Sequence, residues 1–301
     1  MNIKKWLFQN TKSLAGKKVA VTGTTGGLGR QLCRYLAMLG AELLFLDRSA
    51  ERSMAHREAL LKEYPYCKIE CFSLDLEDLH SAKRAVNKLV LWDVDILIHN
   101  AGAYKIDRHT CHGGYDNIFQ INFATPYYMT KQLLPHLRKK KGRVLAVGSV
   151  AHTYSHIDES DVDFKTRQAC SKVYGNAKRY LMFALHELFK DEKDLHFALV
   201  HPGITVTGIT AHYPKWLYAL IKYPMKVIFM KPKKASLSLL RGVFEDTGYG
   251  QWIGPPFFHV WGYPKKKTLN TCQEAEKKKI WELAERVYTN LADDGRKSDT
   301  F

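Results

Sequence analysis

A tyrosine and a lysine four residues apart, Tyr174 and Lys178, are the residues of this sequence whose types and spacing best suit chemistry. Side chains four positions apart lie on the same face of a helix, so the phenol and the ammonium would point into the same space. A phenol with a pKa of about 10 carries protons poorly at neutral pH, and a neighbouring cation lowers that pKa by stabilising the phenolate. The pair therefore predicts proton transfer, although the same spacing also occurs at the edge of many amphipathic helices.

The residues around this pair predict the helix that would position it. Six apolar residues recur there at helical spacing: Val173, Ala177, Leu181, Ala184, Leu185 and Leu188. Such a stripe indicates a helix with one face packed on a core. We therefore expect Tyr174 and Lys178 to lie at the edge of that buried face.

A glycine-rich turn is the first candidate for cofactor binding. It follows a β-branched run at residues 18–22, and leucines at helical spacing come after it. A turn between a strand and a helix presents backbone N–H groups and the positive end of the helix dipole to a pyrophosphate. The alternative is a purely structural turn, since the spacing Gly-x3-Gly-x-Gly differs from the commoner Gly-x-Gly-x-x-Gly. The candidate contacts are Gly23, Thr25, Gly27, Leu28 and Gly29.

The next predicted strand, residues 42–47, ends in Asp47 and is followed by Arg48. A carboxylate at this strand end can accept hydrogen bonds from the adenosine ribose and would repel a 2′-phosphate, which favours NAD. An arginine there can bind the 2′-phosphate of NADP in a bidentate manner, so the two residues leave the choice open. Because no basic residue lies within the glycine turn, we predict that NADH binds more tightly than NADPH.

Two further strands end in candidate cofactor contacts. The third, residues 68–75, ends at Asp75, which with Leu76 could contact adenine; alternatively, Asp75 caps the following helix. The fourth, residues 95–99, runs into three residues that favour close backbone approach: Asn100, Ala101 and Gly102. Strands that alternate with helices predict a parallel sheet, and its ligands gather at the carboxyl ends of the strands.

The remaining candidates follow the same rule. Strand 143–149 delivers the Ser149 hydroxyl to this edge, and a helix at about 115–137 carries Asn122. A strand at 195–200 leads to the last group of candidates, Pro202, Gly203, Thr205 and Thr207. We predict an α/β fold: a Rossmann-type, doubly wound parallel sheet of about seven strands flanked by helices. Each of these polar residues alone is usually a cap or turn residue, so the argument depends on their joint placement.

The composition narrows the classes of protein. The 301 residues carry a net charge of +16, which invites nucleic acid, an anionic membrane or an acidic substrate as partners. The lysines are scattered and no nucleic-acid motif accompanies them, so we expect no nucleic-acid partner. The six cysteines are widely spaced and form no CxxC, which predicts reduced thiols in a cytoplasmic protein and no metal site. We find neither a signal peptide nor a run of the roughly 20 apolar residues that span a bilayer.

Together, these motifs resemble the short-chain dehydrogenase/reductase family over about residues 15–249. Thr22-Gly23-x3-Gly27-x-Gly29 is similar to its TGxxxGxG turn, and Asn100-Ala101-Gly102 to its NAG motif. Tyr174-x3-Lys178 is similar to its YxxxK motif, and Pro202-Gly203 to its PG motif. Three further features resemble the retinol-dehydrogenase-like or hydroxysteroid-dehydrogenase-like branch, which usually prefers NADP. They are the long gap between Ser149 and Tyr174, the helix pattern near residues 279–283 and His201 before the PG motif.

The resemblance implies roles for each matching residue. Tyr174 would be the general acid and base, Ser149 would orient the substrate carbonyl, and Lys178 would lower the pKa of Tyr174 and hold the nicotinamide ribose. Asn122 would bind a water that links Lys178 to solvent, and Thr207 would contact the carboxamide. The implied activity is NAD(P)-dependent hydride transfer to or from an apolar alcohol or carbonyl, such as a steroid, retinoid or lipid-like compound. The alternative is a nucleotide-binding regulatory protein without turnover.

The resemblance also divides the chain. We expect one domain over residues 1–301, with a core at about 15–250, a basic extension at 1–14 and a C-terminal helix and tail at 262–301. Segment 208–234 matches the place where family members cover the substrate, and it combines apolar residues and lysines without an acidic residue. It would line an apolar pocket; alternatively, it packs on the domain, forms a homo-oligomer surface or holds the protein at an anionic membrane.

Overall fold

The computed structural model describes residues 2–203 and 230–297, and for 294–297 it describes the backbone alone. Thr205, Thr207 and residues 208–229 of the predicted substrate-covering segment lie outside the described residues.

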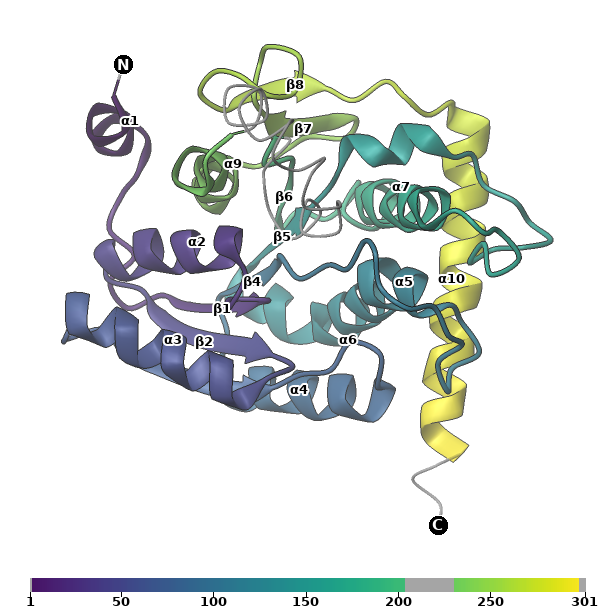
Figure 1. The fold of residues 1–301 in the computed structure, drawn as a ribbon, viewed down its shortest axis with the longest axis horizontal. Helices are drawn as coiled ribbons and strands as arrows, with labels where there is room; N and C mark the ends of the chain where they lie inside the picture. Colours follow the sequence, from purple (N-terminus) through teal and green to yellow (C-terminus); the bar gives the residue numbers. More distant parts are fainter. Residues whose placement is uncertain (1, 204–229, 298–301) are drawn as a thin grey trace, which may run out of the picture.

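A single sheet forms the centre of the molecule (Figure 1). Its strands are β1 Lys18–Thr22, β2 Glu42–Asp47, β3 Ile69–Ser73, β4 Ile96–His99, β5 Arg143–Val147, β6 His196–Val200, β7 Gln251–Gly254 and β8 Lys265–Thr268. Their spatial order is β3-β2-β1-β4-β5-β6-β7-β8. The pairs from β3 to β7 are parallel, and β8 is added antiparallel to β7 at the edge. The predicted parallel, doubly wound sheet is confirmed, with one antiparallel strand more than expected.

Helices cover both faces of this sheet. The helical segments are α1 Ile3–Asn10, α2 Gly27–Met38, α3 Ala50–Glu63, α4 Leu79–Leu91, α5 Asn117–Phe119, η1 Gln120–Ala124, α6 Thr125–Lys140, η2 Val150–Tyr154, α7 Cys170–Leu188, α9 Pro232–Phe244 and α10 Glu274–Lys297. Within β1, Val19 and Val21 pack with α2 and α9, whereas Ala20 packs with α4, α6 and α7 on the other face. This alternation is the period of two that a strand imposes on its side chains.

Two helical segments differ from the sequence-based expectation. The predicted basic extension at 1–14 contains α1, whose Trp6 is only 1% exposed and stacks on Tyr263 with ring centroids 6.3 Å apart. The predicted helix at 115–137 consists of α5, η1 and α6, and η1 is a π-helical turn. Such turns are rare and are often found at functional sites. None of the helices in the described ranges is long and apolar enough to cross a membrane.

Candidate active site

Ser149, Tyr174 and Lys178 come together at the carboxyl end of β5. Ser149 follows this strand after Gly148, and its hydroxyl is near enough to the phenol of Tyr174 to lower the pKa of the tyrosine. The Lys178 ammonium, on a side chain that is 3% exposed, donates to the carbonyl oxygen of Val147 at 3.0 Å and lies 5.7 Å from the centroid of the Tyr174 ring. The three polar groups therefore share one partly buried space beside the sheet edge.

Helix α7 positions two of these three groups as its sequence predicts. Five of its six predicted stripe residues are buried, and the sixth, Leu188, is partly buried. The Cβ of an alanine at position 175 would lie 2.5 Å from the carbonyl oxygen of Ala151, so only a glycine allows η2 to pack this closely on α7. Since η2 directly follows Ser149, the close approach at Gly175 sets where the serine lies relative to Tyr174. Gly175 is not among the site residues predicted from the sequence.

Asn122 lies in η1 beside the lysine. Its amide nitrogen donates to the carbonyl oxygens of Ala103 at 2.7 Å and Ile118 at 2.8 Å. Its Oδ1 is buried and has no hydrogen-bond partner among the described residues. A Cβ on Gly102 would lie 2.8 Å from this oxygen and 3.7 Å from the Lys178 nitrogen, so both groups face the space that the glycine leaves. The π-helical turn thus directs a free acceptor toward the lysine, in the place that the resemblance implies.

Burial dominates the titration of the tyrosine and the lysine. It raises the pKa of Tyr174 to about 12, against the lowering effect of the hydrogen bond with Ser149. It also lowers the pKa of Lys178 to about 8, because a buried ammonium loses hydration. Lys178 is not among the groups that shift the pKa of Tyr174 here, so the expectation that it brings this pKa toward neutrality stays a prediction. At neutral pH the pair consists of a phenol and an ammonium, and the phenol can donate a proton.

Two side chains that the sequence analysis did not identify adjoin these groups. The ring of Tyr104 meets that of Tyr174 edge to face, with centroids 5.1 Å apart. His152 is buried, and its Nδ1 lies 2.6 Å from the carbonyl oxygen of Ser149 while its Nε2 lies 2.6 Å from the hydroxyl of Thr271. It thereby connects the backbone of Ser149 to the chain that precedes α10. The only signal in the sequence is its position three residues after the serine.

The glycine turn and the Asn100 segment are locked together. Gly23 has a φ of +72°, and a Cβ there would lie 2.8 Å from the Cα of Ala101. Asn100 Nδ2 donates to the carbonyl oxygens of Thr22 and Gly23, both at 2.9 Å. Helix α2 begins at Gly27 after Gly26, which supplies no side-chain cap. The start of the helix therefore has backbone donors for a phosphate, and the turn fits the pyrophosphate of a dinucleotide.

The buried carboxylate of Asp47 is hydrogen-bonded to the glycine turn. The side chain is 4% exposed, and its Oδ2 accepts hydrogen bonds from the hydroxyls of Thr24 and Ser53. Its Oδ1 accepts from the backbone N–H of Thr25 at 3.3 Å. The sequence predicts an acceptor for the ribose, whereas the structure commits this carboxylate to the glycine turn. Asp47 therefore has little remaining capacity to accept a hydrogen bond from the ribose of NAD, and the NAD preference stays a prediction.

Arg48 and the predicted adenine contacts lie at the neighbouring strand ends. Arg48 is exposed, and its Nη1 lies 3.4 Å from Oε1 of Glu77. Asp75 accepts a hydrogen bond from the Glu77 N–H at 3.0 Å, and Leu76 is buried. The N-cap of α4 is Asp78 and not Asp75, so the capping alternative for Asp75 is wrong. Asp75 instead forms a local turn beside the predicted adenine position.

The other described candidates of the cofactor site, Pro202 and Gly203, end the first described range of the chain. Gly203 has a φ of +89°, and a Cβ there would lie 2.7 Å from the sulfur of Met230. It follows Pro202 at the carboxyl end of β6, whereas Thr205 and Thr207 lie outside the described residues. A surface hollow of about 390 Å³, lined by residues 63–68 among others, adjoins Glu42 at the amino end of β2. It therefore lies at the opposite edge of the sheet from the candidate site.

Comparison with known protein families identifies the family of this chain. The family described as short chain dehydrogenase matches residues 17–217. The chain belongs to the short-chain dehydrogenase family. This family consists of NAD(P)-dependent dehydrogenases and reductases, and the match includes the glycine turn, Ser149 and the Tyr174–Lys178 pair.

Individual relatives are more distant. The chain is 27% identical over 209 residues to the chloroplastic short-chain dehydrogenase TIC 32 A of Brassica napus. This alignment covers 64% of this chain and 65% of that protein. It is 28% identical over 206 residues to retinol dehydrogenase 13 of Homo sapiens, and this alignment covers 66% of this chain and 62% of that protein. The chain thus matches less than two thirds of the length of these relatives, and their similarity agrees with the retinol-dehydrogenase-like resemblance.

The fold has a solved counterpart over nearly its full length. A crystal structure of an uncharacterized protein from Mycobacterium Paratuberculosis superposes with a TM-score of 0.74. The match covers 93% of this chain and 96% of that chain at 22% sequence identity. At this identity the similarity establishes the fold alone.

Proposed function

We propose that this short-chain dehydrogenase family member catalyses hydride transfer between a nicotinamide cofactor and an alcohol or carbonyl group. The observation that carries the proposal is the meeting of Ser149, Tyr174 and Lys178 at the carboxyl end of β5, with the free Oδ1 of Asn122 facing the same space as the lysine. Four groups from β5, η1 and α7 meet at the sheet edge where parallel sheets bind their ligands.

The chain's own residues would handle the proton. In reduction, Ser149 would donate a hydrogen bond to the substrate carbonyl, and Tyr174 would give its phenolic proton to that oxygen as the C–H bond forms. The bound nicotinamide supplies the hydride, or accepts it in the reverse direction. Lys178 would stabilise the resulting phenolate, and a proton would return past Asn122. Because the pKa of Tyr174 is about 12, its phenol is protonated at neutral pH and ready for this step.

The cofactor would lie across the glycine turn. Gly23, Thr25, Gly27, Leu28 and Gly29 would hold the pyrophosphate, Asp75 and Leu76 the adenine, and Asn100 to Gly102 the neighbouring ribose. The buried Asp47 carboxylate already accepts three hydrogen bonds, which leaves Arg48 as the exposed group at the end of β2. We therefore propose NADP as a cofactor, with Arg48 at its 2′-phosphate, in place of the NAD preference that the sequence predicts.

The substrate would be apolar. The support comes from the amino-acid sequence of 208–234, rich in apolar residues, and from the sequence similarity to human retinol dehydrogenase 13. A turnover screen with NADPH and NADH against steroid, retinoid and aliphatic carbonyls tests this. We expect small hydrophilic carbonyls to be poor substrates, and preferred turnover of those would contradict the proposal. Self-association and contact with an anionic membrane stay predictions.

Replacing the proton donor tests the catalytic assignment. We expect Tyr174→Phe to remove most turnover while NADPH still binds, because the substitution removes one hydroxyl and keeps the ring. NADPH binding is measured by nicotinamide fluorescence, and Tyr180→Phe, a buried tyrosine on the same helix, is the matched control. Near wild-type turnover in Tyr174→Phe would contradict the assignment. The regulatory alternative instead predicts cofactor binding without turnover in the unmodified protein.

A further inference from the structure

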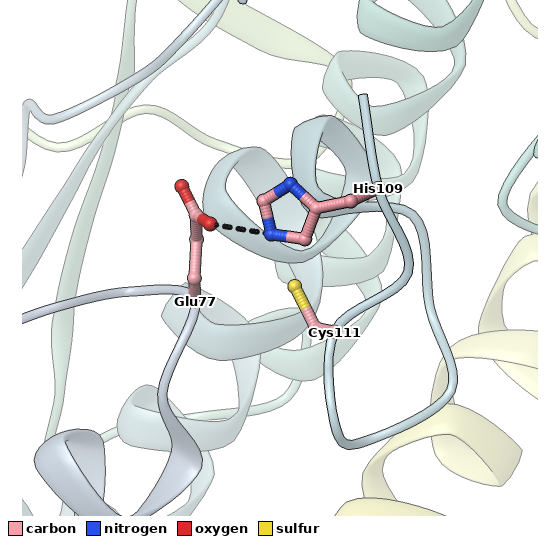
Figure 2. A group of neighbouring side chains, drawn as sticks. All are labelled: Glu77, His109 and Cys111. Carbon is pink, nitrogen blue, oxygen red and sulfur yellow. Dashed lines mark ion pairs between the residues drawn. The ribbon is translucent and has the colours of Figure 1, made fainter. Parts of the chain in front are cut away.

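Three side chains that could bind a metal meet outside the proposed catalytic group. Glu77 lies in the connection between β3 and α4, and His109 and Cys111 lie in the segment between β4 and α5. Within the described parts of the chain, these three side chains place one ligand atom each so that all three atoms lie within 4.8 Å of one another. Figure 2 shows the carboxylate, the imidazole and the thiol directed toward a common point.

The segment that carries two of these ligands is held by its own backbone. The N–H of Cys111 donates to the carbonyl oxygen of Tyr115 at 2.8 Å, and the N–H of Gly114 donates back to the Cys111 carbonyl at 2.9 Å. The carbonyl oxygen of His109 accepts from the N–H of Asn117 at 3.0 Å. Cys111 is 7% exposed, whereas the side chain of His109 is 55% exposed. These backbone hydrogen bonds therefore place the two residues near each other before a metal binds.

The electrostatics of the cluster favour a cation. His109 Nε2 lies 2.9 Å from Oε2 of Glu77. The carboxylates of Glu77, Asp116 and Asp75 act on the Cys111 thiol, and two of them are paired with arginines: Glu77 with Arg48 at 3.4 Å and Asp116 with Arg108 at 2.8 Å. A divalent cation bound among these acceptors would displace the thiol proton.

The ligand types select the metal. Thiolate, imidazole and carboxylate together suit Zn²⁺, whereas Mg²⁺ and Ca²⁺ prefer ligand sets made of oxygen. Three protein ligands leave the fourth tetrahedral position to water. The geometry points to a zinc-type site at which Glu77, His109 and Cys111 bind one divalent transition metal ion, and we propose that this ion links the β3–α4 connection to the segment before α5. This departs from the sequence-based expectation of no metal site, which considered only cysteine spacing.

Loading the site requires two proton movements. The Cys111 thiol gives its proton to solvent, and the imidazole proton that faces Glu77 moves from Nε2 to Nδ1. The side-chain amide of Asn117, whose nitrogen lies 3.1 Å from Nδ1, would turn so that its oxygen accepts this proton. This turn would break the hydrogen bonds of the amide with the carbonyl oxygen of Asp107 and the N–H of His109. Asn117 would then orient the metal-bound imidazole, as carboxylates and carbonyls do at other metal sites.

Cobalt titration of metal-stripped protein tests the site directly and does not depend on turnover. We expect one Co²⁺ per chain, with a thiolate-to-cobalt charge-transfer band in the near ultraviolet that Zn²⁺ abolishes and Mg²⁺ does not. Cys111→Ser should lose the band, and Glu77→Gln and His109→Asn should weaken binding by on the order of tenfold or more. Cys67→Ser is the matched control, because Cys67 is a half-buried thiol away from the cluster, and it should keep the band.

Thermal unfolding provides a second measurement that separates metal binding from misfolding. Zn²⁺ should raise the melting temperature of the unmodified protein and of Cys67→Ser, but not that of Cys111→Ser, since a ligand that binds only the folded state stabilises it. Circular dichroism checks that each variant is folded. The proposal is overturned if the unmodified protein shows no stoichiometric band, or if the band persists in Cys111→Ser. An equal thermal shift in both proteins would also overturn it.

Discussion

The substitution Gly175→Ala is the sharpest test of how the fold positions the proposed catalytic groups. The new methyl carbon would lie 2.5 Å from the carbonyl oxygen of Ala151, and ordinary contact begins at 3.4 Å. Helix α7 and η2 must therefore separate by about 0.9 Å, the difference of these two distances. Ser149 would move with η2, because its hydroxyl accepts from the N–H of Ala151 at 3.2 Å.

The effects on stability and on turnover should differ in size. Overpacking costs about 1–3 kcal/mol, and the better helix propensity of alanine returns about 1 kcal/mol, so the free energy of unfolding should fall by only about 0–2 kcal/mol. A misplacement of about 1 Å at a reacting group costs on the order of 100-fold in rate. We therefore expect a folded Gly175→Ala protein whose kcat is on the order of 100-fold lower, with the affinity for NADPH retained.

Steady-state kinetics with either cofactor, together with urea unfolding, measures both quantities. Gly248→Ala is the matched control, because Gly248 is far along the chain from the site. A Cβ there would lie 3.3 Å from the flexible end of Gln251, which can move. We expect this control to keep both turnover and stability. A folded Gly175→Ala protein with turnover within about twofold of the unmodified enzyme would show that the close packing of η2 on α7 does not position Ser149, and the geometric argument would fail.

The remaining predictions concern charge. Because the pKa of Lys178 is about 8 and its ammonium is the charged form, the reduction rate should fall as pH rises through about 8; a profile flat up to pH 10 would refute a role for the ammonium. The unfolded chain keeps this proton to higher pH, so the contribution of Lys178 to the free energy of unfolding should rise over the same range; urea titrations at several pH values would show it as the difference between the unmodified protein and Lys178→Met. Arg48→Gln should raise KM for NADPH about tenfold and leave KM for NADH nearly unchanged, because a charge-assisted hydrogen bond contributes about 1.5–3 kcal/mol. Equal changes for both cofactors would remove Arg48 from the 2′-phosphate.

The parallel sheet could be predicted from the sequence because its strands are short apolar runs that end in glycine or polar residues. The predicted bounds of β1 and β2 match the structure at both ends. Strand β8 could not be predicted, since Lys265, Lys266 and Lys267 show no apolar alternation. Lysines are common on edge strands, where they discourage pairing with another chain, and only the partner strand β7 identifies this one.

The side-chain arrangement could be predicted only where helix or strand geometry fixes it. Tyr174 and Lys178 share a face because they are four residues apart on one helix. The orientation of Asp47 depends on Thr24 and Ser53, which come from different segments and are brought to it by the fold. The approach of Glu77 to Cys111 likewise joins two connections that are distant in the sequence, so spacing alone carries no signal of it.

Burial shifts the pKa values of Tyr174 and Lys178 in opposite directions. Burial penalises charge on both residues, so at neutral pH the site holds a neutral phenol and one buried cation. When the phenol gives up its proton, the pair changes from one uncompensated positive charge to an ion pair without net charge. Attraction to the ammonium then offsets part of the cost of burying the phenolate. The proposed reduction would therefore lead toward the state with the better balanced charge, and above pH 8 the loss of the Lys178 proton would remove that compensation.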